Sequence, residues 1–239
     1  MTLYLPDTNC ILQSQVSLAT HTSLRVGGTA EWYVAPQNSE HLQRSLQWAQ
    51  QEHLPVTFLG GGSNLLISDR GLPGLVISAR YFRNLTIDEE RATITAAAGM
   101  PLATVAWKAA KRGWSGLEWA VGIPGTVGGS VVMNAGAHGA CMGDALVEIV
   151  VATAEGKLEQ LTPTDLEFRY RTSNLQNRPR WVMEASFQLH PGYAKEAITA
   201  QTRANLNQRR SHQPYDKPSC GSVFRNPQNR AAGWLIEPA

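Results

Sequence analysis

The chain has 239 residues, of which 43% are hydrophobic and 17% are charged, and its formal net charge at pH 7 is +2. This length is enough to bury a substantial core, in one large domain or two modest ones. A net charge so close to zero argues against a protein that binds nucleic acid or a membrane surface through a basic face. The small basic cluster at Arg203, Arg209 and Arg210 would equally suit a small phosphorylated ligand.

The three cysteines, Cys10, Cys141 and Cys220, are widely separated and odd in number. They form no CxxC motif and no cysteine–histidine pair with zinc spacing, so we expect neither a disulfide framework nor a metal site. The N-terminus lacks the basic start and apolar core of a signal peptide, and no apolar run approaches the length of a membrane span. We therefore expect a cytoplasmic protein without membrane insertion.

The first part of the chain predicts a strand, a helix and a second strand. Residues 1–20 carry little pattern and are expected to form an N-terminal arm. After an apolar, strand-like run, Ser39 is a suitable N-cap, and apolar residues recur at helical spacing until Pro55 ends the helix. Residues 56–59 then predict a short buried strand, which leads into a first glycine-rich loop, GGGSNLL at 60–66.

Strand-like alternation follows this loop, at residues 75–77, 85–87 and 92–98. Pro101 opens a predicted helix, and Gly113 ends it after a last turn rich in basic residues, which complement the helix dipole. A second glycine-rich loop, GIPGTVGGSVVMNAGA, occupies residues 122–137. Its apolar residues 131–133 are expected to begin or line a short helix behind the loop.

The C-terminal third contains three further strand candidates, at residues 146–154, 157–161 and 181–189. Pro191-Gly192 then breaks the chain, and a long polar helix is predicted over 194–210. The next segment, 212–227, is rich in proline, glycine and small polar residues, which is typical of a loop. A domain boundary is therefore predicted at Pro191-Gly192.

Both glycine-rich loops have the composition of backbone that takes positive φ or approaches another group very closely. Backbone amides without bulky side chains around them form anion sites, especially where a helix begins. Either loop alone would be read as a tight turn, but the two together indicate two sides of one phosphate-bearing ligand. Neither loop has the strand–GxGxxG–helix context of a dinucleotide fold, and neither has the lysine of a P-loop.

Four motifs occur in an order found in one family: GGGSNLL (60–66), GIPGTVGGSVVMNAGA (122–137), YRTS (170–173) and PSCGSVFRNP (218–227). On these motifs the chain resembles the bacterial UDP-N-acetylenolpyruvoylglucosamine reductases, over residues 21–237. The resemblance implies an α+β fold, with an FAD-binding fold of the vanillyl-alcohol-oxidase type in two subdomains and an incomplete α+β substrate domain. The implied parts are an N-terminal arm at 1–20, an FAD-binding domain at 21–190 that divides near 70–75, and the start of a C-terminal substrate-binding domain at 191–239.

The resemblance also implies that FAD is bound non-covalently, so attachment through His138 or Cys141 is not expected. The first glycine loop is expected to hold the FAD diphosphate, through Gly60, Gly61, Gly62, Ser63, Asn64 and Leu65. The second loop is expected to share this role and then to run along the cofactor, through Gly122, Ile123, Pro124, Gly125, Thr126, Gly128, Gly129, Asn134, Ala135 and Gly136. A further match to the family, at residues 25–28, either supports the cofactor or forms a plain turn.

The family's reaction, in peptidoglycan precursor synthesis, implies two half-reactions: NADPH reduces FAD, and an enolpyruvyl sugar nucleotide then takes the hydride. The intermediate needs a fixed cation beside the substrate carboxylate and an acid that protonates the neighbouring carbon. By resemblance, Arg171 is the catalytic cation and Ser222 is the proton donor. Contacts to the substrate are expected from Tyr170, Arg225 and Asn226, while Arg169 is expected to be structural.

The family normally continues past this C-terminus and carries a third catalytic group, a glutamate, near its end. Glu237 does not match that glutamate, because it follows the serine motif too closely. We therefore expect a C-terminally truncated chain, either a fragment of a reductase or a reductase with impaired activity, and we expect a monomer that binds small molecules only. Two alternatives stay open: an FAD-binding protein with little or no turnover, and a sugar or alcohol oxidase of the same flavin fold.

Overall fold

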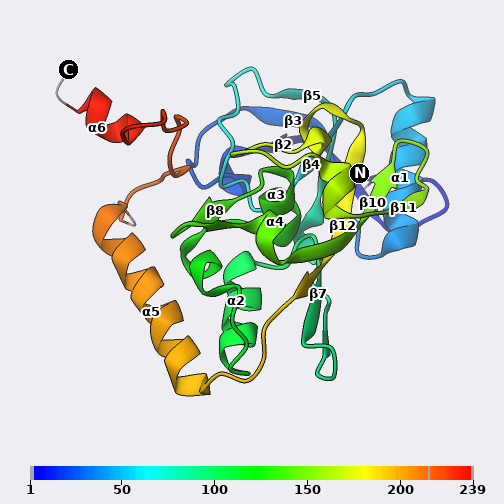
Figure 1. Cartoon of the computed structure of the whole chain (residues 1–239). Coiled ribbons are helices and arrows are strands. Elements are labelled where there is room, and N and C mark those ends of the chain that lie inside the picture. Colours follow the sequence, from blue (N-terminus) through cyan, green and yellow to red (C-terminus); the bar gives the residue numbers. More distant parts are fainter. Residues whose placement is uncertain (1–2, 215, 238–239) are drawn as a thin grey trace.

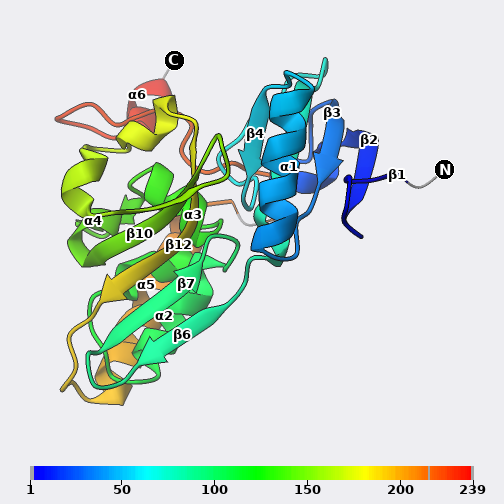
Figure 2. The ribbon, with the colours of Figure 1, turned by 90° about the vertical axis from the view of Figure 1, so that its right-hand side faces the viewer.

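The computed structural model describes residues 3–214 and 216–237; the ends of the predicted arm and of the C-terminal segment, at 1–2 and 238–239, and residue 215 lie outside this description. Two five-stranded sheets form the framework. Each sheet belongs to its own subdomain, and the two subdomains lie side by side (Figure 2).

The first subdomain is built on a sheet with the strand order β1-β2-β3-β5-β4. Its strands are β1 (Leu3–Tyr4), β2 (Ile11–Ser17), β3 (Thr29–Val34), β4 (Val56–Leu59) and β5 (Leu72–Ser78). Strands β3, β5 and β4 run parallel, and helix α1 (Ser39–Gln51) makes the crossover from β3 to β4 that parallel pairing requires. The helix buries Leu42, Leu46 and Ala49 in an apolar cluster shared with this sheet. The first glycine loop therefore follows a strand whose sheet is covered by α1.

The predicted N-terminal arm contains two strands, β1 and β2, in the structure. Strand β2 pairs antiparallel with both β1 and β3. Of its seven residues only Leu12 is buried, so the strand has no alternation of apolar and polar residues that would reveal it. The helix start also differs by one residue from the prediction: Asn38, not Ser39, is the N-cap of α1, and its Oδ1 accepts a hydrogen bond from the His41 amide at 2.8 Å.

The second subdomain is built on an antiparallel sheet with the strand order β11-β10-β12-β7-β6. Its strands are β6 (Leu85–Asp88), β7 (Thr93–Ala97), β10 (Leu146–Thr153), β11 (Leu158–Leu161) and β12 (Arg180–Gln188). The accompanying helices and hairpin are α2 (Leu102–Ala110), α3 (Val127–Val132), α4 (Met142–Ala145), β8 (Gly136–Ala137) and β9 (Ala140–Cys141). Ile94, Leu102 and Phe187 are fully buried in the core between sheet and helices. The predicted strands and helix of this region are confirmed, with ends that differ by a few residues.

Five short 3-10 helices connect these elements. They are η1 (Ala19–His21), η2 (Ala79–Tyr81), η3 (Glu118–Gly122), η4 (Pro163–Leu166) and η5 (Asn174–Asn177). Three of them adjoin the motifs found in the sequence: η3 leads into the second glycine loop, and η4 and η5 flank the YRTS motif.

The two subdomains share an apolar contact. Ala152 and Met183 of the second sheet belong to the same buried cluster as Leu46 of α1. Next to them, the rings of Phe58 and Trp181 stack with their centroids 6.5 Å apart. This contact fixes the first glycine loop relative to the second subdomain.

Helix α5 (Lys195–His212) follows the predicted boundary at Pro191-Gly192 and runs along one flank of the molecule (Figure 1). It packs on α2 and η3, and the Thr199 hydroxyl donates to the Ala110 carbonyl at 3.4 Å. The chain then returns toward the glycine loops and ends with α6 (Ala232–Ile236). Over the two described ranges, no helix combines the length and the apolar character that crossing a bilayer requires.

Candidate functional site

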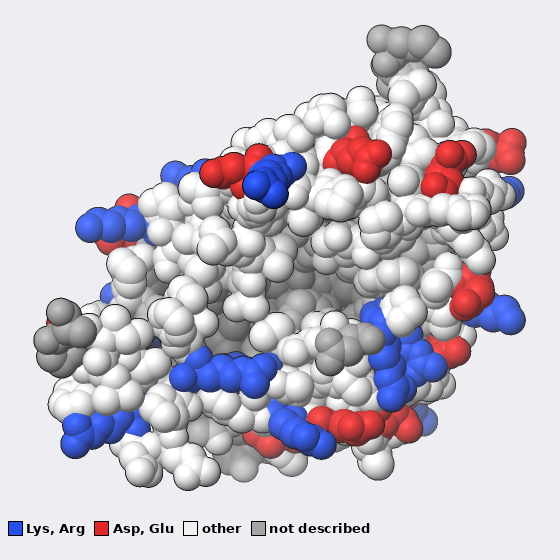
Figure 3. Space-filling view, turned by 90° about the horizontal axis from the view of Figure 1, so that it is seen from above, with Lys and Arg blue, Asp and Glu red and all other residues white. Residues whose placement is uncertain are grey.

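A cavity of about 920 Å³ brings together all four sequence motifs. Its wall is formed by the first glycine loop, the second glycine loop with α3, the turn at Tyr170 and Arg171, and the segment from Cys220 to Asn226. The surface in Figure 3 is hollowed near its middle, with Lys or Arg side chains at the edge of the hollow.

The charged residues of the described cavity wall are all arginines: Arg171, Arg178, Arg180, Arg209 and Arg225. No Asp or Glu of the described residues lines it. Five guanidinium groups without a carboxylate produce a positive potential, and their planar forks of donors suit phosphate and carboxylate groups. The cavity is therefore suited to an anionic ligand.

The first glycine loop is in close contact with its surroundings. Gly62 has φ +62°, and a Cβ at this position would collide with the His21 carbonyl oxygen. A Cβ on Gly60 would lie 2.5 Å from the Thr126 hydroxyl oxygen. The loop can therefore take this path only with glycine, as the sequence predicts.

The second glycine loop packs directly on the first. Gly125 has φ +114°, and a Cβ there would lie 2.6 Å from the Ser63 hydroxyl oxygen. Further along, the amides of Val127 and Gly128 donate to the carbonyls of Met100 and Ala98, at 2.9 and 3.0 Å. These bonds hold the start of α3 on the segment that leaves β7, and the contact of Gly125 with Ser63 joins the two glycine loops in one wall.

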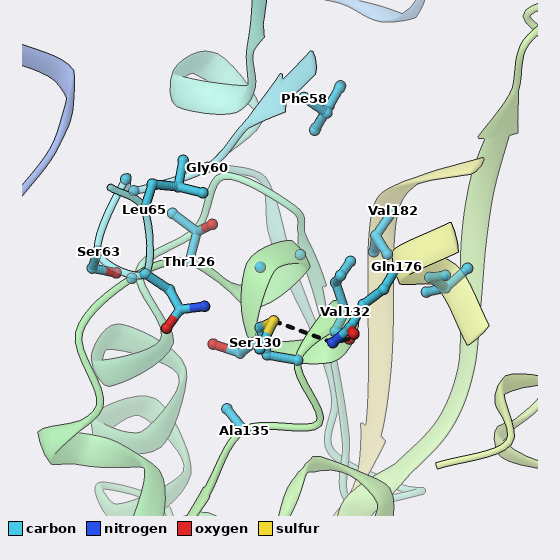
Figure 4. A pocket seen from close by; sticks show the side chains of 18 of the residues that line it. Phe58, Gly60, Ser63, Leu65, Thr126, Ser130, Val132, Ala135, Gln176 and Val182 are labelled. Atoms are coloured by element: carbon cyan, nitrogen blue, oxygen red, sulfur yellow. Dashed lines mark hydrogen bonds between the residues drawn. The ribbon is translucent and has the colours of Figure 1, made fainter. Parts of the chain in front are cut away.

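Several hydrogen-bond donors of this wall have no acceptor among the described residues. They are the backbone amides of Gly61, Gly62, Ser63, Gly125, Thr126 and Gly129, all in residues that line the cavity. The Thr126 hydroxyl is buried and also has no partner within the described part of the chain. Figure 4 shows Thr126 close to Gly60 and Ser63. Several donors without a protein acceptor, one of them buried, can together bind an anion, so this wall suits a group such as a diphosphate.

Arg171 lies at the tip of a tight turn. The backbone groups of Arg169 and Thr172 exchange two hydrogen bonds, at 3.0 and 3.1 Å, and Arg171 between them has φ +56°. Its guanidinium donates to the Gly136 carbonyl and lies 5.0 Å from the centroid of the Tyr170 ring. Both the backbone and the guanidinium of Arg171 are thus fixed by hydrogen bonds, so Arg171 is a preorganised cation.

Behind the turn, Gln176 of η5 donates from its amide to the Val132 carbonyl, at 3.3 Å, and contacts the Met133 sulfur (Figure 4). The same amide donates to the Arg171 carbonyl, also at 3.3 Å. Gln176 therefore connects the turn to the end of α3.

Ser222 lines the same cavity from an exposed segment. The Ser219 amide donates to the Ser23 carbonyl at 3.2 Å, and Arg225 Nη2 donates to the Thr172 hydroxyl at 2.9 Å. The second bond joins the serine segment to the turn of Arg171. The two residues named from the sequence as a catalytic pair therefore line one cavity.

Two of the predicted cofactor residues, Gly122 and Asn134, are not among the residues that line this cavity. A Cβ on Gly122 would lie only 2.6 Å from the Cδ atom of Arg209 on α5. Glycine at this position therefore allows α5 to pack closely. The amide side chain of Asn134 bonds to the Arg169 carbonyl and the Gly143 amide. All the other predicted cofactor-binding, catalytic and substrate-binding residues line the cavity.

Some lining residues were not predicted as site residues. Among them are Ser130, Met133, Gln176, Arg180 and Arg209. Ser130 and Met133 belong to the second glycine motif, and Arg209 belongs to the basic cluster on α5, so a signal existed for these three. Gln176 and Arg180 lie beyond any motif.

The thiol of Cys141 is not positioned for covalent chemistry on a ligand in the cavity, which it does not line. Burial raises its pKa, and the neighbouring Asp144 carboxylate raises it further. The thiol is therefore protonated near neutral pH and a weak nucleophile. His138 does not line the cavity either, and no group of His, Cys, Asp and Glu in the described ranges could hold a metal ion.

Comparison with protein families gives two matches. Residues 30–162 match the FAD binding domain, and residues 213–239 match the C-terminal domain of UDP-N-acetylenolpyruvoylglucosamine reductase. The first match contains both glycine loops, and the second contains the serine motif.

Individual relatives agree with these matches. UDP-N-acetylenolpyruvoylglucosamine reductase of Acaryochloris marina is 57% identical over 235 residues, which are 98% of this chain and 76% of the relative. The protein of the same description from Synechocystis sp. is 58% identical, again over 98% of this chain and over 74% of the relative.

Among solved structures, UDP-N-acetylenolpyruvylglucosamine reductase from Thermus caldophilus aligns with a TM-score of 0.82 and 34% identity, covering 96% of this chain and 80% of that one. 6-Hydroxy-D-nicotine oxidase from Arthrobacter nicotinovorans aligns with a TM-score of 0.58 and 17% identity, over 80% of this chain and 42% of that one. At that identity the likeness to an oxidase shows the fold alone, and it supports the FAD-binding fold expected from the sequence.

Proposed function

The chain belongs to the UDP-N-acetylenolpyruvoylglucosamine reductase family, and from this premise we propose how its cavity performs the reaction. The enzyme is an FAD-dependent oxidoreductase that uses NADPH to reduce the enolpyruvyl group of UDP-N-acetylglucosamine enolpyruvate, giving UDP-N-acetylmuramate for peptidoglycan synthesis. Our proposal concerns which residues bind, orient and protonate.

The observation that carries the proposal is the chemistry of the cavity wall: unpaired donors on two glycine loops, and arginines without a carboxylate. Both the cofactor and the sugar nucleotide contain a diphosphate, and the substrate also has a carboxylate. A cavity of about 920 Å³ is at the upper end of the volumes typical of small-molecule sites.

FAD is proposed to bind non-covalently along the two glycine loops. The amides of Gly61, Gly62 and Ser63 are proposed to donate to the diphosphate from the first loop, and the Thr126 amide and hydroxyl from the second. FAD held there would supply the hydride chemistry that connects NADPH with the enolpyruvyl group. The chain's part is to hold the diphosphate through donors that have no competing partner.

Arg171 is proposed to stabilise the substrate carboxylate while negative charge spreads into it. The Gly136 carbonyl and the backbone turn fix the guanidinium before substrate arrives. Charge stabilisation by a preorganised group costs no reorganisation at the moment of reaction, which is why such groups contribute strongly. Arginine also stays protonated throughout and offers two parallel donors to a carboxylate.

Ser222 is proposed to donate the proton to the carbon beside that carboxylate. A hydroxyl is a weak acid and can do so only because the carbanion it meets is far more basic than water. Its neighbour Gly221 has φ +75°, and this turn presents the serine at the cavity wall. Tyr170, Arg225 and Asn226, which line the same part of the cavity, are proposed to bind the sugar nucleotide.

The substrates are small molecules, a sugar nucleotide and NADPH. We propose that the protein is a monomer and acts in the cytoplasm, where its substrates would be made. The three cysteines are free, which suits a reducing compartment. Residues 191–239 are proposed to begin the substrate domain, with α5 packed on the FAD-binding part.

Anaerobic flavin absorbance of the purified chain tests this function. Addition of NADPH should bleach the flavin, and addition of the enolpyruvyl sugar nucleotide should then restore its colour. A chain that bleaches and stays bleached would support the alternative of an FAD-binding protein without turnover. A chain that binds no flavin would contradict the proposed role of the glycine loops.

A further inference from the structure

We propose that Asn134 is a positioning residue for Arg171: its side-chain amide fixes the turn that carries the catalytic arginine. This inference rests on the function proposed for Arg171 and adds a residue that acts through it. Asn134 was expected to contact the cofactor, but its side chain bonds to protein groups on the other side of the cavity wall.

Asn134 lies in the loop between α3 and β8, and only 5% of its surface is exposed. Its Nδ2 donates to the Arg169 carbonyl at 3.0 Å, and its Oδ1 accepts from the Gly143 amide at 3.1 Å. Arg169 is the residue at the base of the turn whose tip is Arg171. One side chain therefore connects the arginine turn to the beginning of α4.

An asparagine meets the demands of this position. The side chain must donate to one backbone group and accept from another, which an amide does and a carboxylate or an alkyl group does not. The backbone of Asn134 has φ +39°, a region that asparagine tolerates better than most residues. Loss of the donor would leave the Arg169 carbonyl without this partner and free the base of the turn to move.

The residues next to Asn134 hold the same turn at two other points. The Gly136 carbonyl accepts from the guanidinium of Arg171. The Val132 carbonyl accepts from the Ser173 hydroxyl at 2.7 Å, and Ser173 is 1% exposed. Residues 132–136 thus fix the turn before Arg171, after Arg171 and at its charged head. Asn134 supplies the contact to Arg169, and this contact comes from a side chain, whereas Val132 and Gly136 use backbone carbonyls. A substitution can therefore remove the contact of Asn134 alone.

The substitution Asn134→Asp separates the two bonds of the side chain. Aspartate keeps the size of the side chain and an acceptor for the Gly143 amide, but it cannot donate to the Arg169 carbonyl. We expect reoxidation of the reduced flavin by the enolpyruvyl sugar nucleotide to slow about tenfold, since small displacements of a catalytic group are costly. Flavin content and the rate of flavin reduction by NADPH should stay near the wild-type values, because Asn134 does not line the cavity in which the cofactor is proposed to bind.

Asn174→Asp is the matched control. Asn174 also donates through Nδ2 to a backbone carbonyl, that of Asp165, at 2.6 Å, and it does not line the cavity. It lies three residues after Arg171 but outside the contacts that hold the turn. The same change there should alter neither half-reaction by more than about twofold.

A double-mutant cycle with Arg171→Ala gives the decisive readout. If Asn134 acts through Arg171, Asn134→Asp should slow reoxidation in the wild-type background and have no further effect in the Arg171→Ala background. Equal effects in both backgrounds would overturn the proposal, because a general structural defect does not depend on Arg171. If the new carboxylate prevents flavin binding, Asn134→Ala is carried through the same cycle, and loss of the folded flavoprotein in both variants would assign Asn134 a purely structural role.

These results separate the inference from the function on which it rests. A wild-type chain whose flavin is not reoxidised by substrate, or an Arg171→Ala chain as fast as wild type, would reject the proposed role of Arg171. A slow Arg171→Ala chain with a normal Asn134→Asp chain would reject only the role of Asn134.

Discussion

The two proposed catalytic residues line one cavity but are held very differently. The turn of Arg171 is fixed by hydrogen bonds from the side chains of Asn134, Ser173 and Gln176 and by a bond from its own guanidinium. The segment of Ser222 is exposed, and the Ser219 amide and the Arg225 side chain connect it to the rest of the protein. Among the described residues, the turn of Arg171 is therefore held by more hydrogen bonds than the segment of Ser222.

The way in which the turn of Arg171 is held suits the role proposed for it. A charged group that stabilises developing charge is most effective when it does not move. Substitutions at Ser222 and at Arg171 test the two regions separately.

The largest effect is expected at Ser222. Ser222→Ala removes the proton donor and should lower kcat on the order of 10³-fold, with little change in KM, as expected of a general acid. Steady-state NADPH consumption in the presence of substrate measures it. Ser219→Ala, in the same segment but outside the cavity wall, is the control; an equal loss there would show that the segment, and not the hydroxyl of Ser222, matters.

Arg171→Ala should slow substrate-dependent flavin reoxidation about 100-fold, comparable to loss of one oxyanion-stabilising donor. Arg169→Ala is a demanding control, because Arg169 lies two residues from Arg171 and does not line the cavity. The variant also keeps the backbone carbonyl at position 169 to which Asn134 donates. Rapid-mixing absorbance of the prereduced enzymes measures both. If flavin reoxidation were normal in Arg171→Ala and slow in Arg169→Ala, Arg169 would be the catalytic cation in place of Arg171.

The glycine loops should show an intermediate effect. Gly125→Ala strains a residue with φ +114° and places a methyl group 2.6 Å from the Ser63 hydroxyl, so flavin affinity should fall about tenfold. Gly139→Ala is matched to it, because Gly139 also has positive φ, at +81°, but has no atom within 4 Å of its Cβ position. Fluorescence titration with FAD compares them, and equal loss in both variants would mean that backbone strain, not the contact between loops, decides affinity.

Arg225 joins the two regions, and its loss should have a smaller effect. Arg225→Gln removes the bond to the Thr172 hydroxyl and should raise KM for the sugar nucleotide about threefold, as for one exposed hydrogen bond. Arg230→Gln removes a guanidinium that lies over the Trp234 ring instead and should leave KM unchanged. An unchanged KM in Arg225→Gln would show that the segment holds its place without this bond.

The smallest effect concerns pH. Burial lowers the pKa of His21 below its usual 6.5, and nearby Arg80 lowers it further. The native state therefore binds fewer protons than the unfolded state, so stability is complete above about pH 6.5 and declines as pH falls toward the lowered pKa. His21→Gln should make the Tm of the chain less dependent on pH just below 6.5. A wild-type slope retained in the variant would assign the effect to another group.

The sequence was sufficient for the parts of the site that depend on local motifs. Glycine at residues 60, 62 and 125 is favoured by positive φ or by atoms that lie very close to the Cβ position, and a motif records such a requirement directly. Arg171 and Ser222 were also identified from their motifs, and the structure places both on the cavity wall.

The sequence could not show roles that depend on partners far along the chain. The partners of Asn134 are the Arg169 carbonyl and the Gly143 amide, 35 and 9 residues away, and no motif states which face of the loop its side chain takes. Gly122 contacts Arg209 of α5. The sequence predicts this helix, but it does not show on which part of the protein the helix packs. Strand β2 was missed because its exposure removes the hydrophobic pattern on which strand prediction rests.

The most direct test of the account is an experimental structure of the chain with FAD bound. We predict diphosphate oxygens at hydrogen-bond distance, about 2.7–3.2 Å, from the amides of Gly61, Gly62 and Ser63 and from the Thr126 hydroxyl. Arg171 and Ser222 should both face the isoalloxazine end of the same cavity. A diphosphate bound away from the two glycine loops, or a flavin ring that neither residue faces, would contradict the account.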